Sequence, residues 1–303
     1  MMIPVVFSTD HNFIVPTSVA ILSMLKCSTS DFDIFVLQTP EVTEEDRKNL
    51  EDSIRGFNSR IQFITIGNEF SQSFEVRGIT KISYYRLLIP WLIPNYDWIL
   101  YLDGDIIVKR DLKGIFNYVT DSDKLVYGVR TTGTVLDPDF SQHILSLGLD
   151  NTQYINGGVL LFNCTLMRKQ NLKEQFLNHS DKEYFYQDQD IINLVCKDKI
   201  GWLPLKFNTS LLLMTVDKNK VIKSGISTNN DFMDAIKEPA IIHYAGKKPW
   251  KTFTPNWYDW WHIYSLSPAY NPQFDWESTK LILQPSYSVK QLSKMLLKKI
   301  LNK

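Results

Sequence analysis

Two aspartates interrupt a strongly apolar segment about a third of the way along the chain. Residues 98–110 read WILYLDGDIIVKR, in which Asp103 and Asp105 are separated by Gly104. Side chains two positions apart point to the same face of a regular strand, so both carboxylates would lie close together. Two like charges in an apolar setting are costly unless a cation neutralises them. Carboxylate oxygens suit Mg²⁺ or Mn²⁺, which in turn suit diphosphates, so the spacing predicts a divalent metal site.

The elements before this segment alternate regularly between two patterns. Short β-branched and apolar runs at 3–10, 32–39 and 60–67 predict strands, and the segments between them, 16–26 and 43–57, predict helices. Strand–helix–strand order implies right-handed crossovers and an α/β fold with a mainly parallel central sheet. Ligands bind beyond the carboxyl ends of such strands, which strengthens the interpretation of the two aspartates as a site.

The remaining elements are less regular. We expect a helix at 79–92, a strand through 98–108, and further elements in a single continuous domain that ends near residue 265. The other predicted strands are 125–130, 157–163 and 240–246, the other helices are 165–178 and 189–197, and 201–240 is expected to be irregular.

Residues 266–303 form a predicted C-terminal extension with a basic helix. From Lys280 onward there are six lysines and no acidic residue, and apolar residues recur at helical spacing from Val289 to Ile300. Such an amphipathic helix could lie on an anionic membrane surface through residues 286–303, or pack on its own domain with its lysines in solvent.

Composition excludes several classes of protein. A formal net charge of zero argues against a nucleic-acid binder that works through general basicity. Three cysteines without C-x-x-C spacing predict neither a disulfide framework nor a zinc site, which favours a reducing cytosol. The start MMIPVVFSTD lacks a signal-peptide pattern, and no run reaches the roughly 20 apolar residues of a membrane span. We expect a cytoplasmic protein, soluble or peripheral on the inner face of the cell membrane, and leave its oligomeric state open.

The segment YLDGDIIV resembles the metal-binding segment of nucleotide-sugar-dependent glycosyltransferases of the GT-A fold. More narrowly, five ordered blocks across 3–262 resemble glycosyltransferase family 8, which includes glycogenin and bacterial lipopolysaccharide galactosyl- and glucosyltransferases. The resemblance implies one nucleotide-binding, Rossmann-like domain that uses Mn²⁺ or Mg²⁺ and a UDP-sugar.

Two of these blocks would hold the nucleotide and the charge near it. In VFSTDHNF, the resemblance implies that Ser8 and Asp10 meet uridine and that Phe13 meets the uracil face. Asn12 would meet a polar edge of the nucleotide or of the acceptor. In ITKISYYRLLIP, Ser83 and Arg86 share one helical face, and the arginine would serve the donor sugar, the diphosphate or nearby carboxylates; a structural ion pair is the alternative.

Two further blocks would surround the sugar. In YINGGVLLFN, Asn156 and Gly157 would border the donor sugar. In YQDQDIIN, Asp188 would bond donor hydroxyls and Gln189 would lie beneath the anomeric carbon, while Asp190 caps or begins the helix; Asp188 could do so as well.

IIHYAGKKPW, the second piece of the fifth block after YQDQDIIN, would complete the metal and diphosphate sites. The resemblance implies His243 as the third metal ligand beside Asp103 and Asp105, with Gly246 and Lys248 on the diphosphate. This block is one residue shorter than in some relatives, so Lys247 could take the role of Lys248.

The implied reaction moves glucose or galactose from a UDP-sugar to a glycan or glycolipid hydroxyl with retention, as in lipopolysaccharide, lipooligosaccharide or other cell-surface glycan synthesis. The amide of Gln189 is a far weaker nucleophile than a carboxylate, which favours attack from the same face without a covalent intermediate. Two alternatives stay open. LDGDIIV faintly resembles the motif of haloacid dehalogenase-type phosphatases, with Asp103 as nucleophile, and the chain could also be a non-catalytic UDP-sugar-binding protein.

Overall fold

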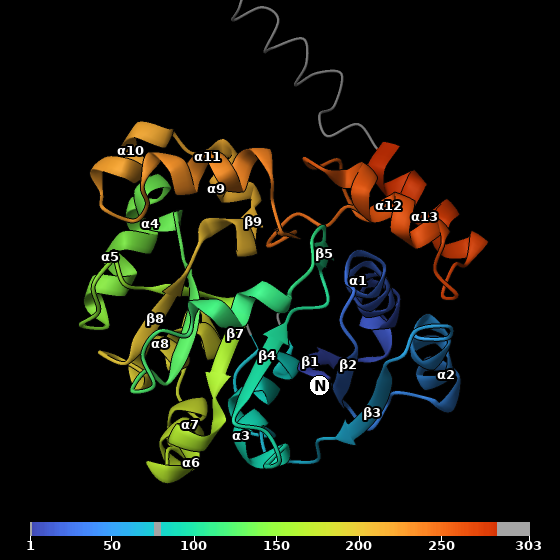
Figure 1. Ribbon diagram of the computed structural model, residues 1–303, viewed down its shortest axis with the longest axis horizontal. Helices are drawn as coiled ribbons and strands as arrows, with labels where there is room; N and C mark the ends of the chain where they lie inside the picture. Colours follow the sequence, from blue (N-terminus) through green and yellow to red (C-terminus); the bar gives the residue numbers. More distant parts are fainter. Residues whose placement is uncertain (1, 76–79, 284–303) are drawn as a thin grey trace, which may run out of the picture.

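A seven-stranded sheet with the strand order β3-β2-β1-β4-β7-β6-β8 runs through the centre of the molecule (Figure 1). The computed structural model describes residues 2–75 and 80–283. The strands are β1 (Ile3–Thr9), β2 (Phe32–Gln38), β3 (Arg60–Thr65), β4 (Trp98–Leu102), β6 (Val126–Arg130), β7 (Ile155–Asn163) and β8 (Ile200–Leu203). Only β7 runs antiparallel to both of its neighbours, β4 and β6, and the other adjacent pairs are parallel. The predicted mainly parallel α/β sheet is therefore confirmed.

The first half of the sheet forms from consecutive strand–helix units. β1 is buried along nearly its whole length, as expected of a parallel strand covered on both faces. The crossover helix α1 (Ile14–Cys27) follows the short turn η1 (His11–Phe13). α2 (Glu44–Ser53) begins at a capping box in which Thr43 and Asp46 exchange hydrogen bonds with each other's backbone N–H. These crossovers bring the carboxyl ends of β1 and β4 to one edge of the sheet.

The segment with the two aspartates is not one continuous strand, which corrects the prediction for 98–108. β4 ends at Leu102, and β5 (Ile106–Val108) belongs to a separate three-stranded sheet with β10 (Ile241–His243) and β9 (Thr209–Ser210). The backbone N–H of Asp103 still donates to Gly158 O of β7 at 2.9 Å, whereas Asp105 O accepts from Tyr244 N beyond β10 at 2.9 Å. The D-G-D turn therefore connects the two sheets.

Two helical predictions need adjustment. The predicted helix at 79–92 is a 3₁₀ helix, η2 (Lys81–Leu88), followed by the single turn α3 (Ile89–Leu92). The predicted helix at 165–178 consists of α6 (Cys164–Lys169) and α7 (Lys173–Ser180), separated by Asn171 in the left-handed backbone region. α8 (Gln187–Val195) lies two residues earlier than predicted.

The region 201–240 contains regular helices, which corrects the prediction that it would be irregular. Besides β9 it contains η4 (Leu205–Asn208), α9 (Leu211–Thr215), α10 (Lys218–Lys223) and α11 (Asn229–Lys237), which lie together at one end of the molecule (Figure 1). The three α-helices begin at side-chain caps, Ser210, Asp217 and Thr228. The remaining short elements are η3 (Lys113–Tyr118), α4 (Gly133–Leu136) and α5 (Pro138–Ser146).

The last described helices, α12 (Trp257–Ser265) and α13 (Pro272–Leu283), lie beside α1 (Figure 1). Trp260 is fully buried against Trp250 and Tyr264, and Ser267 Oγ lies 2.8 Å from Ser18 Oγ of α1. The described residues beyond 265 therefore pack on the main domain. That the main domain ends near residue 265 stays a prediction. The predicted basic helix at 286–303 lies outside the described residues. Within 2–75 and 80–283, no helix combines the length and hydropathy needed to cross a membrane.

Candidate active site

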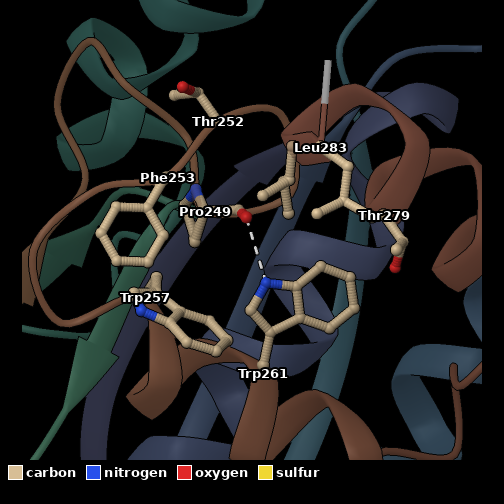
Figure 2. Close-up of a pocket in the computed structure, with 8 residues that line it drawn as sticks. Pro249, Thr252, Phe253, Trp257, Trp261, Thr279 and Leu283 are labelled. Atoms are coloured by element: carbon tan, nitrogen blue, oxygen red, sulfur yellow. Dashed lines mark hydrogen bonds between the residues drawn. The ribbon is translucent and has the colours of Figure 1, made fainter. Parts of the chain in front are cut away.

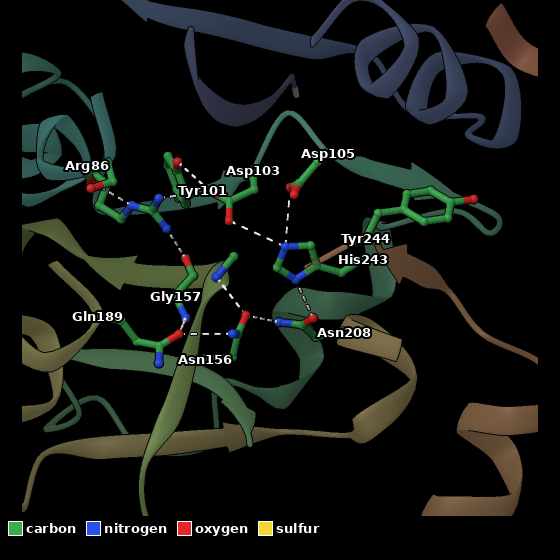
Figure 3. Close-up of polar contacts among 12 residues, drawn as sticks. Arg86, Tyr101, Asp103, Asp105, Asn156, Gly157, Gln189, Asn208, His243 and Tyr244 are labelled. Carbon is green, nitrogen blue, oxygen red and sulfur yellow. Dashed lines mark hydrogen bonds and ion pairs between the residues drawn. The ribbon is translucent and has the colours of Figure 1, made fainter. Parts of the chain in front are cut away.

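The side chains of Asp103, Asp105 and His243 converge at the junction of the two sheets. One ligand atom of each lies within 4.8 Å of the others. His243 Nε2 is 3.6 Å from Asp103 Oδ2 and 3.3 Å from Asp105 Oδ1 (Figure 3). Asp103 follows β4, Asp105 precedes β5 and His243 ends β10, so residues 140 positions apart meet because β5 pairs with β10. An imidazole nitrogen with two carboxylates is a donor set that fits Mn²⁺ or Mg²⁺.

The other ring nitrogen of His243, Nδ1, has a hydrogen-bond partner. His243 is buried, and its Nδ1 lies 2.9 Å from Asn208 Oδ1. Metal-ligating histidines commonly use their second nitrogen in this way. Sequence reasoning missed Asn208 because it lies in 201–240, where no motif surrounds it.

Arg86 forms a buried charge cluster on the other side of Asp103. Its Nη2 is 2.9 Å from Asp103 Oδ1, and its Nε is 3.0 Å from Asp188 Oδ2. Burial would lower the pKa of the guanidinium, but these two carboxylates raise it on balance. Its Nη1 donates to Gly157 O, and the guanidinium lies 4.4 Å over the ring of Tyr101. Arg86 therefore holds Asp103 and Asp188 at fixed positions.

The two carboxylates of α8 have different partners. Burial raises the pKa of Asp188 to about 6, although Arg86 acts to lower it. Asp190 Oδ2 accepts from Tyr186 N at 2.8 Å and lies 2.8 Å from His143 Nε2. Asp190 is the fourth residue of α8 and Tyr186 is the N-cap residue, so Asp190 neither caps nor begins this helix, which corrects the prediction. Asp188 instead faces Arg86. Ser83, three residues before Arg86 on η2, is buried as well.

The side chain of Gln189 faces the start of β7. Gln189 Oε1 accepts from Asn156 Nδ2 and from Gly157 N, both at 2.9 Å. Its Nε2 donates to Tyr154 OH at 3.2 Å. Because β7 is antiparallel to β4, its first residues lie at the same sheet edge as Asp103. The structure thus brings Asn156, Gly157 and Gln189 together beside the cluster of Asp103, Asp105 and His243.

Lys248 reaches back from the loop after β10. Its Nζ pairs with Asp105 Oδ2 and donates to Tyr244 O at 3.1 Å. Burial alone would raise the pKa of Asp105, but Lys248 and His243 lower it on balance. Lys247 is exposed. Gly246 adopts φ +86°, which glycine allows without strain. Of the two lysines, Lys248 is the one at the cluster.

The residues after β1 line the other side of the D-G-D turn. A Cβ on Gly104 would lie 3.0 Å from Phe13 Cδ1, so the ring of Phe13 contacts this turn, and its edge also meets Trp250. Ser8 Oγ and Asp10 Oδ1 are buried without a hydrogen-bond partner among the described residues. Burial raises the pKa of Asp10. Unpartnered buried polar atoms of this kind suit a polar ligand. Asn12 is exposed.

Two more residues of the site lie next to predicted ones. Tyr101 OH donates to Asp103 Oδ1 at 2.8 Å. A Cβ on Gly158 would lie 2.2 Å from His243 Cε1 and 2.8 Å from Asp103 Oδ2, so only glycine lets the histidine approach β7. Both residues flank motifs that were recognised, but their roles depend on contacts between strands.

A separate hollow of about 420 Å³ opens between α12 and α13 (Figure 2). Its walls are mainly carbon, from Pro249, Phe253, Trp257, Trp261 and Leu283, and Trp261 Nε1 donates to Pro249 O at 3.0 Å. Among residues 2–75 and 80–283, no ionisable side chain lines it. This hollow therefore lacks the groups that bind a diphosphate, and the polar cluster is the candidate active site.

Comparison with known proteins shows which proteins this chain is similar to. The family model described as glycosyl transferase family 8 matches residues 4–254. The chain is 26% identical to lipopolysaccharide glucosyltransferase WaaO of Escherichia coli (strain K12), over 96% of this chain and 85% of the relative. It is 24% identical to lipopolysaccharide 1,3-galactosyltransferase of Salmonella typhimurium, over 82% of this chain and 73% of the relative. The fold is also similar to a crystal structure of the galactosyltransferase LgtC with donor and acceptor sugar analogues. The two structures superpose with a TM-score of 0.68 at 23% sequence identity, and the match covers 94% of this chain and 98% of that one.

Proposed function

The chain belongs to glycosyl transferase family 8, and we propose that it transfers glucose or galactose from a UDP-sugar to an acceptor hydroxyl in a metal-dependent reaction that retains the anomeric configuration. The observation that carries the proposal is the convergence of Asp103, Asp105 and His243 beside Lys248. In this proposal the three side chains hold Mn²⁺ or Mg²⁺, and the bound ion neutralises charge on the diphosphate of the leaving UDP.

Residues around the cluster would bind the rest of the donor. Lys248 would exchange its pairing with Asp105 for the diphosphate and add fixed positive charge where the leaving group develops negative charge. Gly246 would allow the backbone to approach the phosphates. The unpartnered oxygens of Ser8 and Asp10 support their proposed contacts with uridine, and Phe13 would contribute its ring face to uracil.

The sugar would lie between β7 and α8. Asn156 and Gly157 border this position, Asp188 would accept hydrogen bonds from donor hydroxyls, and Arg86 would keep that carboxylate in place. Gln189 Oε1 already accepts two hydrogen bonds, and an amide oxygen is a weak nucleophile, which supports a positioning role rather than covalent catalysis.

The proposed reaction is therefore an attack from the face that UDP leaves. The bond from the anomeric carbon to the phosphate oxygen breaks, and the acceptor oxygen bonds to the same carbon. The acceptor proton passes to the departing phosphate, so no enzyme base is required. Isolation of a covalent glycosyl-enzyme during turnover would overturn this part of the proposal.

The acceptor that we propose is a glycan or glycolipid of the cell surface, such as lipopolysaccharide or lipooligosaccharide. Two similar proteins carry names of lipopolysaccharide glycosyltransferases, which supports this class. We also propose a cytoplasmic enzyme that meets its acceptor at the inner face of the membrane through residues 286–303. Co-sedimentation with anionic vesicles, lost when Lys290, Lys294 and Lys298 are changed to glutamate, would support this; equal sedimentation of both proteins would contradict it.

UDP release from a panel of nucleotide sugars tests the main proposal. The expected result is metal-dependent release from UDP-glucose or UDP-galactose by the wild type, lost in Asp105→Ala. If no donor is turned over, UDP binding in the presence of Mn²⁺ would support a non-catalytic UDP-sugar-binding protein instead. Phosphate release from simple phosphomonoesters would support the phosphatase alternative, which the position of Asp103 after β4, rather than after the first strand, disfavours.

A further inference from the structure

A chain of side-chain amides connects the metal cluster with the residues around Gln189. His243 Nδ1 lies 2.9 Å from Asn208 Oδ1, and Asn208 Nδ2 donates to Asn156 Oδ1 at 2.8 Å. Asn156 Nδ2 in turn donates to Gln189 Oε1 at 2.9 Å (Figure 3). Asn208 is 5% exposed, so solvent cannot easily replace either of its partners.

The direction of every hydrogen bond in this chain follows from two backbone groups. A backbone N–H can only donate, and Gly158 N donates to Asn156 Oδ1 at 2.9 Å while Gly157 N donates to Gln189 Oε1 at 2.9 Å. Asn156 therefore offers its side-chain oxygen as the acceptor, and Asn208 must donate to it from its NH₂ group.

The orientation of Asn208 then decides the state of the histidine. With its NH₂ group on Asn156, Asn208 turns its oxygen toward His243 Nδ1, which must carry a proton to form this hydrogen bond. In the neutral ring the lone pair is then on Nε2, the nitrogen that faces Asp103 and Asp105.

We propose that Asn208 is a positioning residue that fixes His243 in the Nδ1–H tautomer and thereby prepares Nε2 to bind the divalent cation. This inference rests on the proposed function for its cation. It adds that the backbone of β7, through Asn156 and Asn208, sets the tautomer of a ligand on β10. The metal site and the proposed donor-sugar site are thus parts of one hydrogen-bond network.

The first measurement is the ring ¹⁵N spectrum of metal-free protein labelled at histidine, in which the two nitrogens of a neutral ring show which of them carries the proton. The chain has five histidines, and comparison with His243→Gln assigns the signal of interest. We expect the Nδ1–H pattern for His243 in the wild type and a substantial Nε2–H population in Asn208→Ala. An Nε2–H pattern in the wild type, or an unchanged tautomer in the variant, would overturn the inference.

The second measurement is the affinity for Mn²⁺ alone, without nucleotide or sugar, by electron paramagnetic resonance. Loss of a partner of this kind weakens metal binding about 10- to 100-fold, and we expect a weakening in that range for Asn208→Ala. Asn163→Ala is the matched control, because Asn163 is equally buried, also makes several hydrogen bonds and lies at the far end of β7. Equal affinities of the two variants would overturn the inference.

Two further variants keep the test decisive. Asn208→Asp retains an acceptor for Nδ1–H and is expected to preserve the tautomer; loss of the tautomer here would count against the inference. If Asn208→Ala fails to fold, Asn208→Leu fills a similar volume without hydrogen bonds and takes its place. A wild type with the Nδ1–H tautomer that neither binds UDP nor releases it would refute the proposed function and leave the positioning role intact.

Discussion

Arg86, which lies on the opposite side of Asp103 from His243 (Figure 3), forms a buried ion pair with Asp188, with Nε 3.0 Å from Oδ2. The same guanidinium binds Asp103 Oδ1, so one cation holds two carboxylates that would otherwise repel each other. The candidate site therefore contains a buried permanent positive charge at Arg86, in addition to Lys248 and the position proposed for a metal.

Removal of the permanent charge should destabilise the fold. Arg86→Met leaves Asp103 and Asp188 buried without this partner, and we expect the free energy of unfolding in urea to fall by about 3–5 kcal/mol. Arg130→Met is the control, because Arg130 also lies over an aromatic ring, 4.5 Å from Trp202, and its loss should cost about 1 kcal/mol. Similar losses in the two variants would mean that the ion pairs of Arg86 add little.

The raised pKa of Asp188 predicts a pH dependence of stability. The fold raises this pKa from 3.8 to about 6, so between these values the native state binds more protons than the unfolded state. The contribution of Asp188 to stability is therefore largest at low pH and declines as the pH rises through that interval, by on the order of 3 kcal/mol.

The comparison that isolates this effect is Asp188→Asn in metal-free protein. Because the amide does not ionise, the wild type should lose stability relative to the variant as the pH rises from about 4 to about 7. Asp139→Asn, at an exposed position on α5, controls for the loss of one charge. A constant difference between the wild type and Asp188→Asn across this range would refute the predicted shift.

Much of the fold and of the site was accessible from sequence because the relevant signals are local. Alternating apolar runs and helices identified the parallel half of the sheet, and the motifs identified Asp103, Asp105, His243 and Lys248, which the structure brings together. The break between β4 and β5 was missed because apolar residues resume directly after Asp103, Gly104 and Asp105. What splits the strand is pairing with two different partners, β7 and β10, which are distant in sequence.

Asn208 shows the same limit at the level of one residue. It is the last residue of the short 3₁₀ helix η4, and its partners are 35 and 52 positions away. An asparagine acquires such a role only through the packing of three elements. The helices of 201–240 were missed as well, although their caps at Ser210, Asp217 and Thr228 were local signals. In α11 the helical spacing of the buried Phe232 and Ala235 was a second one.

The close approach of His243 to β7 gives a steric prediction. In Gly158→Ala the new Cβ would lie 2.2 Å from His243 Cε1, so the ring must move away from Asp103. We expect the affinity for Mn²⁺ to fall at least about tenfold, because a displaced ligand loses its coordination geometry. Gly114→Ala is the matched control, since nothing lies within 4 Å of a Cβ at that position. Unchanged Mn²⁺ binding in Gly158→Ala would argue against His243 as a ligand.

The two adjacent lysines after β10 give a prediction about the diphosphate. Lys248 Nζ pairs with Asp105, whereas Lys247 is exposed. Of these two lysines, only Lys248 is therefore in position to meet a phosphate bound at the metal cluster. We expect Lys248→Met to reduce kcat/KM for UDP release about 10²- to 10³-fold, the range seen when one group that stabilises developing charge is removed. Lys247→Met, which removes the same charge one residue away, should change it by less than about threefold, since exposed charges contribute little. The reverse order would assign the role to Lys247, the alternative that the shorter loop had left open, and would mean that this loop rearranges when the donor binds.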